Sequence, residues 1–280
     1  MTTRRIITIQ PGASLAAALR RMADRDRCEL EICAGDVEAV RRARARPADV
    51  VITDPATPIE EDLALIAELA AVRPAVRSIV LAPFAVQADV VAALRAHVFA
   101  CFTPPIDDDE VAAMASSAMR AAEWRDGIQV VSGADHWLTL RVSCHLLTAD
   151  RLVRFMTELQ PVVAGTDRDL LIAAFREMLL NAMEHGAGFD ADKVIEVTAA
   201  KTGRAIVYHF KDPGHGFDRG HLRHATVSAE PDAVLRAARA RAEQGLRPGG
   251  FGMLIARQVA DELVYNEPVM AIRLSSSSSA

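Results

Sequence analysis

A glutamate and an asparagine stand four residues apart in the segment 176–186, which reads REMLLNAMEHG. At this spacing Glu177 and Asn181 share one face of a helix, beside an apolar stripe. An amide oxygen is a suitable ligand for Mg²⁺, and a carboxylate one turn away can hold or polarise a water molecule. A solvated helix face carries the same residue types, so this pair by itself leaves both interpretations open.

A second polar segment begins at Asp212, directly after a predicted strand, and reads DPGHG. Its carboxylate can accept a hydrogen bond from an exocyclic amine such as that of adenine. Gly214 and Gly216 allow the backbone to approach a flat ligand closely. The alternative for this segment is an ordinary Asp-Pro-Gly turn.

The third segment is glycine-rich, reads GLRPGGFG over residues 245–252, and precedes a predicted helix at 253–262. A glycine-rich loop at a helix N-terminus offers backbone N–H groups and a positive dipole end to phosphates. The segment lacks the Gly-Lys-Ser/Thr of a Walker A loop, and no strand immediately precedes it, as a dinucleotide-binding turn requires. A flexible surface loop is the alternative.

The elements after residue 126 are predicted to form an α+β domain with an antiparallel meander. Strands are expected at 137–143, 194–199, 205–210, 263–265 and 269–274, with a hairpin turn at Thr202-Gly203. Helices are expected at 149–160, at 166–185 and after Gly252. The tail, residues 275–280, is of low complexity, and we expect it to be disordered.

In order and spacing the three segments resemble the N, G1 and G2 boxes of the GHKL ATPase superfamily, over roughly residues 137–274. Within it, FREMLLNAMEHG and GLRPGGFGMLIARQVADELVYN most resemble the anti-sigma-factor serine kinases. The resemblance implies a histidine-kinase-like ATPase α/β sandwich with ATP and Mg²⁺ as cofactors.

The same resemblance implies a role for individual residues. Glu177 would be the catalytic base or would position a water molecule, Asn181 would be a Mg²⁺ ligand, and Asp212 would accept from the adenine amine. Gly214 and Gly216 would shape the adenine pocket. Gly249, Gly250 and Gly252 would lie around the phosphates. Residues 219–244 would form the mobile lid over ATP.

The first half of the chain alternates apolar runs with helical stretches. The runs lie at 6–9, 30–33, 50–53, 78–81 and 99–102, and the helices at 14–23, 36–46, 60–72, 87–96 and 107–124. Uniformly apolar runs are typical of buried parallel strands. Five βα units in a row predict a five-stranded, doubly wound α/β domain.

This half resembles a response-regulator receiver domain, because Asp54 ends the third predicted strand. Receivers carry an acidic pair after the first strand, Ser or Thr after the fourth, and Lys before Pro after the fifth. Here the chain has Gln10-Pro11, Ala82-Pro83 and Thr103-Pro104-Pro105. Without the acidic pair, a Mg²⁺ ion lacks its carboxylate ligands. Without the lysine, a phosphoryl group on the aspartate lacks its cationic partner. We therefore interpret residues 1–126 as a pseudo-receiver used for docking or dimerisation, with Asp54 a candidate phosphoacceptor or simply a capping residue before Pro55.

The composition of the whole chain limits the class of protein that it can be. The 280 residues carry a formal charge of −5 and are 51% hydrophobic and 25% charged, as expected of a globular protein of about two domains. Mild acidity argues against a charge-driven nucleic-acid partner. No apolar run reaches the ~18 residues of a membrane span, and the first residues lack a signal-peptide pattern. We expect a cytoplasmic protein with domains at 1–126 and 127–274.

The function hypothesis is a Mg-ATP-dependent serine/threonine protein kinase of the anti-sigma-factor type, regulated through the receiver-like half. Its partner would be an anti-sigma antagonist or a sigma-factor-like protein, and the chain itself is a candidate homodimer. A non-catalytic, nucleotide-gated partner-switching module is the alternative. A sensor histidine kinase would need a helical hairpin with a phosphoacceptor histidine before the ATPase domain. His136 and His145 lie in or beside a predicted strand, and residues 126–137 leave no room for two long helices.

Overall fold

The computed structural model describes residues 4–84, 86–121, 125–134, 136–159, 166–201, 205–214, 262–266 and 269–275. The chain divides into two units, residues 1–126 and 127–280. In the ranges described, no helix has the length and apolar character needed to span a bilayer.

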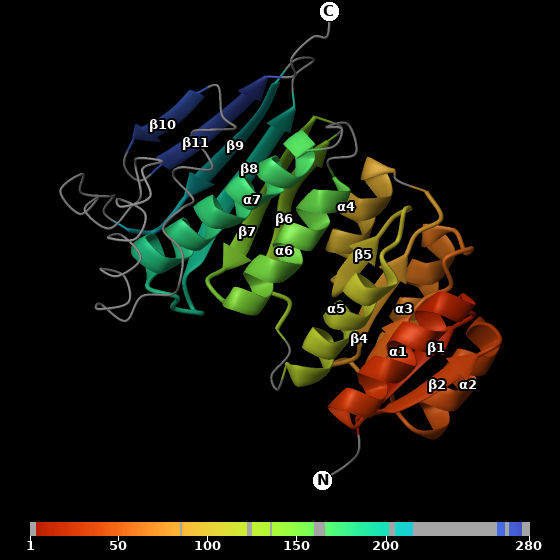
Figure 1. The fold of residues 1–280 in the computed structure, drawn as a ribbon. Helices are drawn as coiled ribbons and strands as arrows, with labels where there is room; N and C mark the ends of the chain where they lie inside the picture. The colour runs from red at the N-terminus through yellow and green to blue at the C-terminus, as the bar shows by residue number, and fades with distance from the viewer. Residues whose placement is uncertain are drawn as a thin grey trace, which may run out of the picture. The chain divides into compact units, whose positions relative to one another are not determined.

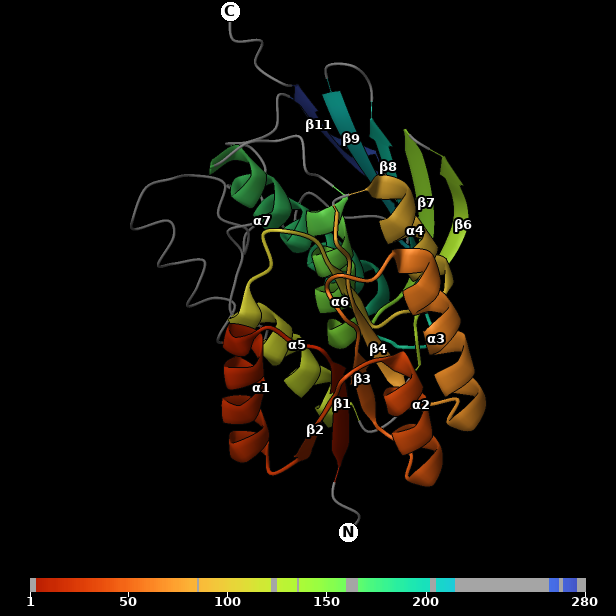
Figure 2. The same cartoon turned by 90° about the vertical axis from the view of Figure 1, so that its right-hand side faces the viewer.

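The first unit is built on a parallel sheet whose described residues form five strands in the order β2-β1-β3-β4-β5. Helices α1 and α5 lie on one face of this sheet and α2, α3 and α4 on the other (Figure 2). This is a doubly wound strand order, so the predicted fold class of the first half is confirmed. The elements are β1 (Arg5–Ile9), α1 (Ala13–Asp26), β2 (Glu29–Cys33), α2 (Asp36–Ala45), β3 (Val50–Ile52), α3 (Ile59–Val72), β4 (Arg77–Leu81), α4 (Gln87–Arg95), β5 (Ala100–Phe102) and α5 (Asp108–Arg120).

Four strands of the first unit, β1, β3, β4 and β5, are buried along their whole length. Helices cover both faces of a parallel sheet, so its strands are apolar on both sides. On one face, Ile7 and Val51 pack with Leu65 and Leu69 of α3. Local signals then set the helix ends: Asp107 caps α5 by accepting from the N–H groups of residues 109 and 110 at 2.9 and 3.1 Å.

The second unit contains an antiparallel sheet, in which the described residues give the order β10-β11-β9-β8-β7-β6. Helices α6 and α7 lie side by side on one face of it (Figure 1). The predicted α+β class of this half is confirmed. The elements are β6 (Ile128–Ala134), β7 (Trp137–Ser143), α6 (Leu146–Glu158), α7 (Thr166–Asn181), the π-helical turn η1 (Ala182–Gly186), β8 (Val194–Lys201), β9 (Ala205–Lys211), β10 (Glu262–Asn266) and β11 (Val269–Ser275).

The second half differs from the sequence-based expectations at three places. Strand β6 was not predicted, because a bulge between Val130 and Ser132 breaks the alternation that marks a strand. The helix expected to reach residue 185 is α-helical only to Asn181 and continues as the wider turn η1. Ser275 belongs to β11 rather than to a disordered tail. The hairpin turn 202–203, the lid 219–244 and the helix after Gly252 lie outside the described residues.

One acidic side chain of the first unit is completely buried. Asp62, in the first turn of α3, accepts a hydrogen bond from the Thr53 hydroxyl at 2.9 Å, and that hydroxyl accepts the Leu81 N–H at 3.1 Å. The other carboxyl oxygen of Asp62, Oδ1, has no hydrogen-bond partner within the described ranges. Burial raises the pKa of Asp62 to about 7; the Thr53 hydrogen bond opposes the shift, and the charges of Asp36, Asp54 and Glu61 reinforce it.

The raised pKa predicts a pH-dependent stability for the first unit. In the unfolded chain this carboxyl ionises near pH 4, whereas in the folded unit it keeps its proton to about pH 7. Stability should therefore fall as pH rises between these values, by at most about 1.4 kcal/mol per pH unit, and level off above pH 7. Asp62→Asn, which is neutral throughout, should flatten this dependence.

Calorimetric melting at pH 5 and pH 8 checks this prediction. The difference between the two melting temperatures should be smaller in Asp62→Asn than in the parent chain. An equal difference in both proteins would mean that Asp62 ionises as an exposed carboxyl does.

Candidate functional site

The position of α7 on the sheet is set by an aromatic contact. The ring of Phe175 lies 5.0 Å from that of Tyr208 and 5.3 Å from that of Phe210, both on β9. All three side chains are buried. Phe175 thus fixes which face of α7 meets the sheet, and residues two and six positions later lie on a different face.

Glu177 and Asn181 lie on this second, partly exposed face. The Glu177 side chain is 16% exposed, and its Oε1 lies 4.0 Å from Nη1 of Arg176. Arg176 is itself held by Asp150 of α6 at 3.1 Å. A carboxylate that is sheltered yet reachable, beside an anchored cation, is suited to hold a water molecule or accept a proton. Asn181, half-buried at the end of α7, presents an amide oxygen of the kind that Mg²⁺ binds.

Gly186, at the end of the turn η1, lies against Asp212, the residue that follows β9. A Cβ built on Gly186 would lie 2.2 Å from Cγ and 2.4 Å from Oδ1 of Asp212. On the other side of the contact, a Cβ on Gly214 would lie 2.8 Å from Oδ1 of Asp212 and 3.1 Å from Gly186 Cα. Both positions therefore exclude a side chain, and we call these three residues the Gly186–Asp212–Gly214 junction.

The junction holds the Asp212 carboxylate in a defined orientation. Its Oδ1 accepts a hydrogen bond from the Gly214 N–H at 2.8 Å, which leaves Oδ2 as the oxygen that can receive a donor from a ligand. Cys144 lies completely buried nearby. Burial raises the pKa of the Cys144 thiol to about 11, and the charges of Asp190 and Asp212 add to this, so the thiol stays protonated at neutral pH.

The structure thus places four of the predicted site residues at the adjoining ends of α7 and β9, namely Glu177, Asn181, Asp212 and Gly214. It does not test their roles. Four others, Gly216, Gly249, Gly250 and Gly252, lie outside the described residues. Within the described ranges no group of three or more His, Cys, Asp or Glu residues could hold a metal ion.

Gly186 directly follows the helix expected at 166–185 and was not among the predicted site residues. The close approach of Asp212 shows its role, which is to leave room for that side chain. Its place directly after the polar helical segment is a signal for this role, but the partner in the contact lies 26 positions further along the chain.

The candidate phosphoacceptor of the first unit lies where the sequence predicts, after the carboxyl end of β3. Asp54 Oδ1 accepts a hydrogen bond from the Ala56 N–H at 2.8 Å, which is the geometry of a local turn. Gln10, after β1, donates from Nε2 to the Ala34 carbonyl at 2.6 Å rather than presenting a carboxylate. Burial and the charges of Asp54 and Glu61 raise the pKa of Asp36, so these three acidic side chains lie close enough to repel one another.

Comparison with known proteins assigns the second half of the chain. Residues 148–276 match the family described as the histidine kinase-like ATPase domain. This segment of the chain is therefore a histidine kinase-like ATPase domain, and a receiver-like α/β domain precedes it. A search of curated proteins found no match.

Solved structures similar to the chain include response-regulator proteins. One is a CheY-like receiver domain protein from Methanospirillum hungatei JF-1, 17% identical, over 42% of this chain and 94% of that one, with a TM-score of 0.37. A second is an orphan response regulator from H. pylori, 11% identical, over 42% and 97%, with a TM-score of 0.37. A third, a response regulator from Thermotoga maritima, is 16% identical over 42% and 98%, with a TM-score of 0.36.

The junction predicts a specific steric effect. Gly186→Ala should destabilise the second unit by about 1–3 kcal/mol, because the new Cβ and the Asp212 side chain cannot occupy the same space. In Gly186→Ala/Asp212→Gly the competing side chain is absent, so the double variant should be more stable than the sum of the two single changes predicts.

Denaturant unfolding of the four proteins measures this coupling. Gly12→Ala is the matched control, because a Cβ at Gly12 meets nothing within 4 Å. Strictly additive free energies of unfolding would show that the two residues do not compete for space.

Proposed function

We propose that the chain is an ATP-binding signalling protein, a Mg-ATP-dependent serine/threonine protein kinase of the anti-sigma-factor type that is regulated through its receiver-like unit. The observation that carries the proposal is the Gly186–Asp212–Gly214 junction, within a segment that matches the histidine kinase-like ATPase family. It brings an oriented carboxylate against the end of the helix that carries Glu177 and Asn181.

These residues carry the donor and acceptor types that Mg-ATP requires. Gly186 and Gly214 leave room for the Asp212 side chain between them and so fix where its carboxylate lies. Oδ2 of Asp212 would accept from the adenine amine, and Asn181 would bind Mg²⁺ through its amide oxygen. A metal ion held by Asn181 would supply positive charge to offset that of the phosphates, and Glu177 would accept the proton of the incoming hydroxyl group.

A serine or threonine of a partner protein is the acceptor we infer. Strand β6 occupies the residues before β7, where a sensor histidine kinase would need its helical hairpin. His145 is engaged as the N-cap of α6, with its Nδ1 accepting the Leu147 N–H at 3.2 Å. These two observations favour an acceptor outside the chain, on an anti-sigma antagonist or a sigma-factor-like protein.

Asp212→Asn tests the adenine contact. A lost hydrogen bond to a charged acceptor should weaken ATP binding by about 1.5–3 kcal/mol, or roughly ten- to hundredfold, in titration calorimetry. Asp169→Asn is the matched control, since Asp169 is an exposed carboxylate of α7 about two turns before Glu177. Equal affinity in the Asp212 variant and the parent chain would remove this residue from the nucleotide site.

Glu177→Gln and Asn181→Ala separate chemistry from binding. Glu177→Gln keeps the shape of the side chain, so Mg-ATP should still bind while phosphoryl transfer or hydrolysis falls by about 10²–10⁴-fold. Asn181→Ala should remove the dependence of ATP affinity on Mg²⁺. The assay is transfer from labelled ATP to candidate partner proteins, with melting curves as the folding control.

The same assay decides between the two functions considered. Full activity in a folded Glu177→Gln protein would rule out Glu177 as the catalytic base. Tight ATP binding by the parent chain without transfer or hydrolysis would instead identify a nucleotide-gated binding module.

A further inference from the structure

A groove lies between α2 and α3, two helices on the same face of the first unit's sheet (Figure 2). It contains a cavity of about 540 Å³, and each helix lines the cavity with one stripe of side chains. The α2 stripe consists of Asp36, Val37, Val40, Arg41 and Arg44, and the α3 stripe of Glu61, Ala64, Leu65 and Glu68. The members of each stripe recur every three or four residues, as on one face of a helix. We call this feature the α2–α3 groove.

The α2–α3 groove has a defined direction and an apolar floor. Strands β2 and β3, which precede the two helices, both run parallel to β1, so α2 and α3 point the same way. From Asp36 to Arg44 the groove extends for about 12 Å, slightly more than two helical turns. Val40 and Leu65 are buried at its floor, whereas Val37 is 86% exposed at its rim. An apolar groove of this length can receive about two turns of an amphipathic helix.

The two basic side chains of the groove already have acidic partners. Arg44 forms an ion pair with Glu68 at 2.8 Å, which joins α2 to α3 at the end where both helices finish. Arg41 lies 3.8 Å from Glu38 of its own helix. Neither arginine is therefore paired with the acidic residues at the opposite end of the groove.

That opposite end, where both helices begin, is acidic. Asp36 lines it from α2 and Glu61 from α3, and within the described residues neither carboxylate forms an ion pair. Burial and the charges of Asp54 and Glu61 raise the pKa of Asp36, which shows that these carboxylates act on one another. A cation between Asp36 and Glu61 would relieve this repulsion, so it is the charge that this end of the groove favours.

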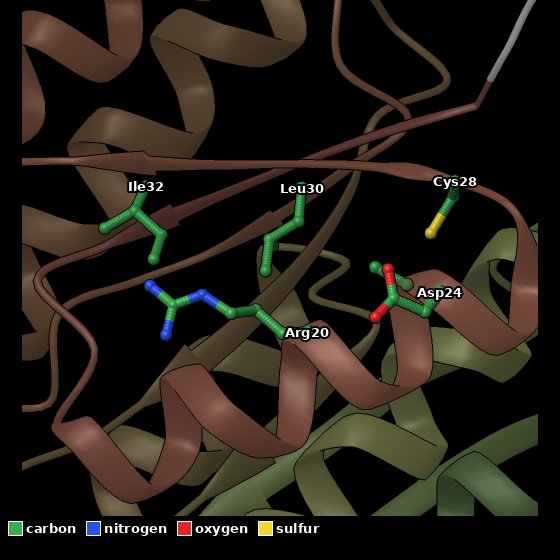
Figure 3. Close-up of a pocket in the computed structure, with 6 residues that line it drawn as sticks. Arg20, Asp24, Cys28, Leu30 and Ile32 are labelled. Carbon is green, nitrogen blue, oxygen red and sulfur yellow. The ribbon is translucent and has the colours of Figure 1, made fainter.

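A second cavity of the first unit has no such preference. It lies on the other face of the sheet, between α1 and β2, and measures about 440 Å³ (Figure 3). Its lining includes one charge of each sign, Arg20 and Asp24, beside the partly exposed Leu30 and Ile32. This pattern does not select a partner by charge, whereas the pattern of the α2–α3 groove does.

We propose that the α2–α3 groove binds an amphipathic helix of a partner protein, and that this helix carries lysine or arginine in its last turn. The helix would lie antiparallel to α2 and α3, with apolar side chains over Val40 and Leu65 and its last turn between Asp36 and Glu61. This direction places the negative end of the partner's helix dipole beside the positive ends of α2 and α3. A cation is also the residue type that stabilises the last turn of a helix.

A second copy of this chain does not provide such a helix among its described elements. Helices α1, α2, α4 and α5 have arginine in the last turn, but each buries its apolar side chains within its own unit. Helices α3, α6 and α7 have no basic residue in the last turn. The occupant that we infer is therefore a helix of a different protein.

Selection from a library of displayed helical peptides tests the proposal on the full chain. The probe is an alanine-rich helix with leucines three and four residues apart and with its first and last turns randomised. Binders of the parent chain should be enriched in lysine and arginine in the last turn. On Glu61→Lys the enrichment should change to glutamate and aspartate, and the parent's binders should lose at least about tenfold in affinity.

Two further variants separate the groove from the rest of the surface. Glu60→Lys is the matched control, because Glu60 is an exposed carboxylate in the same turn of α3 but does not line the cavity. It should keep the basic preference of the parent chain. Val37→Asp changes an exposed side chain at the rim, so it should weaken the selected binders while the melting temperature stays unchanged.

The proposal is overturned if the library yields no binders, or binders without a charge preference in the last turn. It is also overturned if a folded Glu61→Lys protein selects the same basic peptides as the parent chain. Sedimentation velocity of the parent chain adds one more outcome. A dimer that Val37→Asp abolishes would identify a second copy as the occupant, in place of a different protein.

Discussion

The absence of a side chain at residue 186 is the constraint on which the candidate site depends. The end of the α7–η1 helix can approach the end of β9 only because no Cβ stands between Gly186 and the Asp212 carboxylate. The contact of Phe175 with Tyr208 and Phe210 sets where the helix lies on the sheet, and the glycine then sets how closely its end comes to β9. Together they determine the separation between Asp212 and the helix face that carries Glu177 and Asn181.

Much of the fold follows from local patterns that the sequence displays. In the first half the apolar runs are uniform because both faces of the parallel sheet are covered, so their number and order could be predicted. The α5 cap at Asp107 was likewise visible as an acidic start to a helix. Strand β6 was not, since its bulge interrupts the alternation, and the π-helical turn of η1 was not, since Ala182, Met183 and Glu184 are ordinary α-helix formers.

The candidate site also has a part that local sequence patterns indicate and a part that depends on how the elements pack. Residue types and spacing made Glu177, Asn181 and Asp212 candidates, because a four-residue helical interval and a strand end are local features. Their assignment to one site came from the resemblance of the three segments, taken together, to a known family. The contact between Gly186 and Asp212 is not local, since it depends on how α7 packs across β9. Asp62 makes the same point in the first unit: beside Glu60 and Glu61 it has the pattern of an exposed helix start, and only the fold shows that it is buried.

The start of the second unit has a consequence for how the ATPase domain can be isolated. The family match begins at residue 148, whereas the unit begins at Gly127, whose carbonyl accepts the Ser143 N–H at 2.8 Å. A fragment cut to the matched residues would lose β6 and β7 and leave β8 as an unpaired edge strand. Ile195 and Val197 would lose their cross-strand neighbours Val142 and Leu140. An unpaired edge strand favours self-association, so a fragment that keeps this sheet intact begins about twenty residues before the family match.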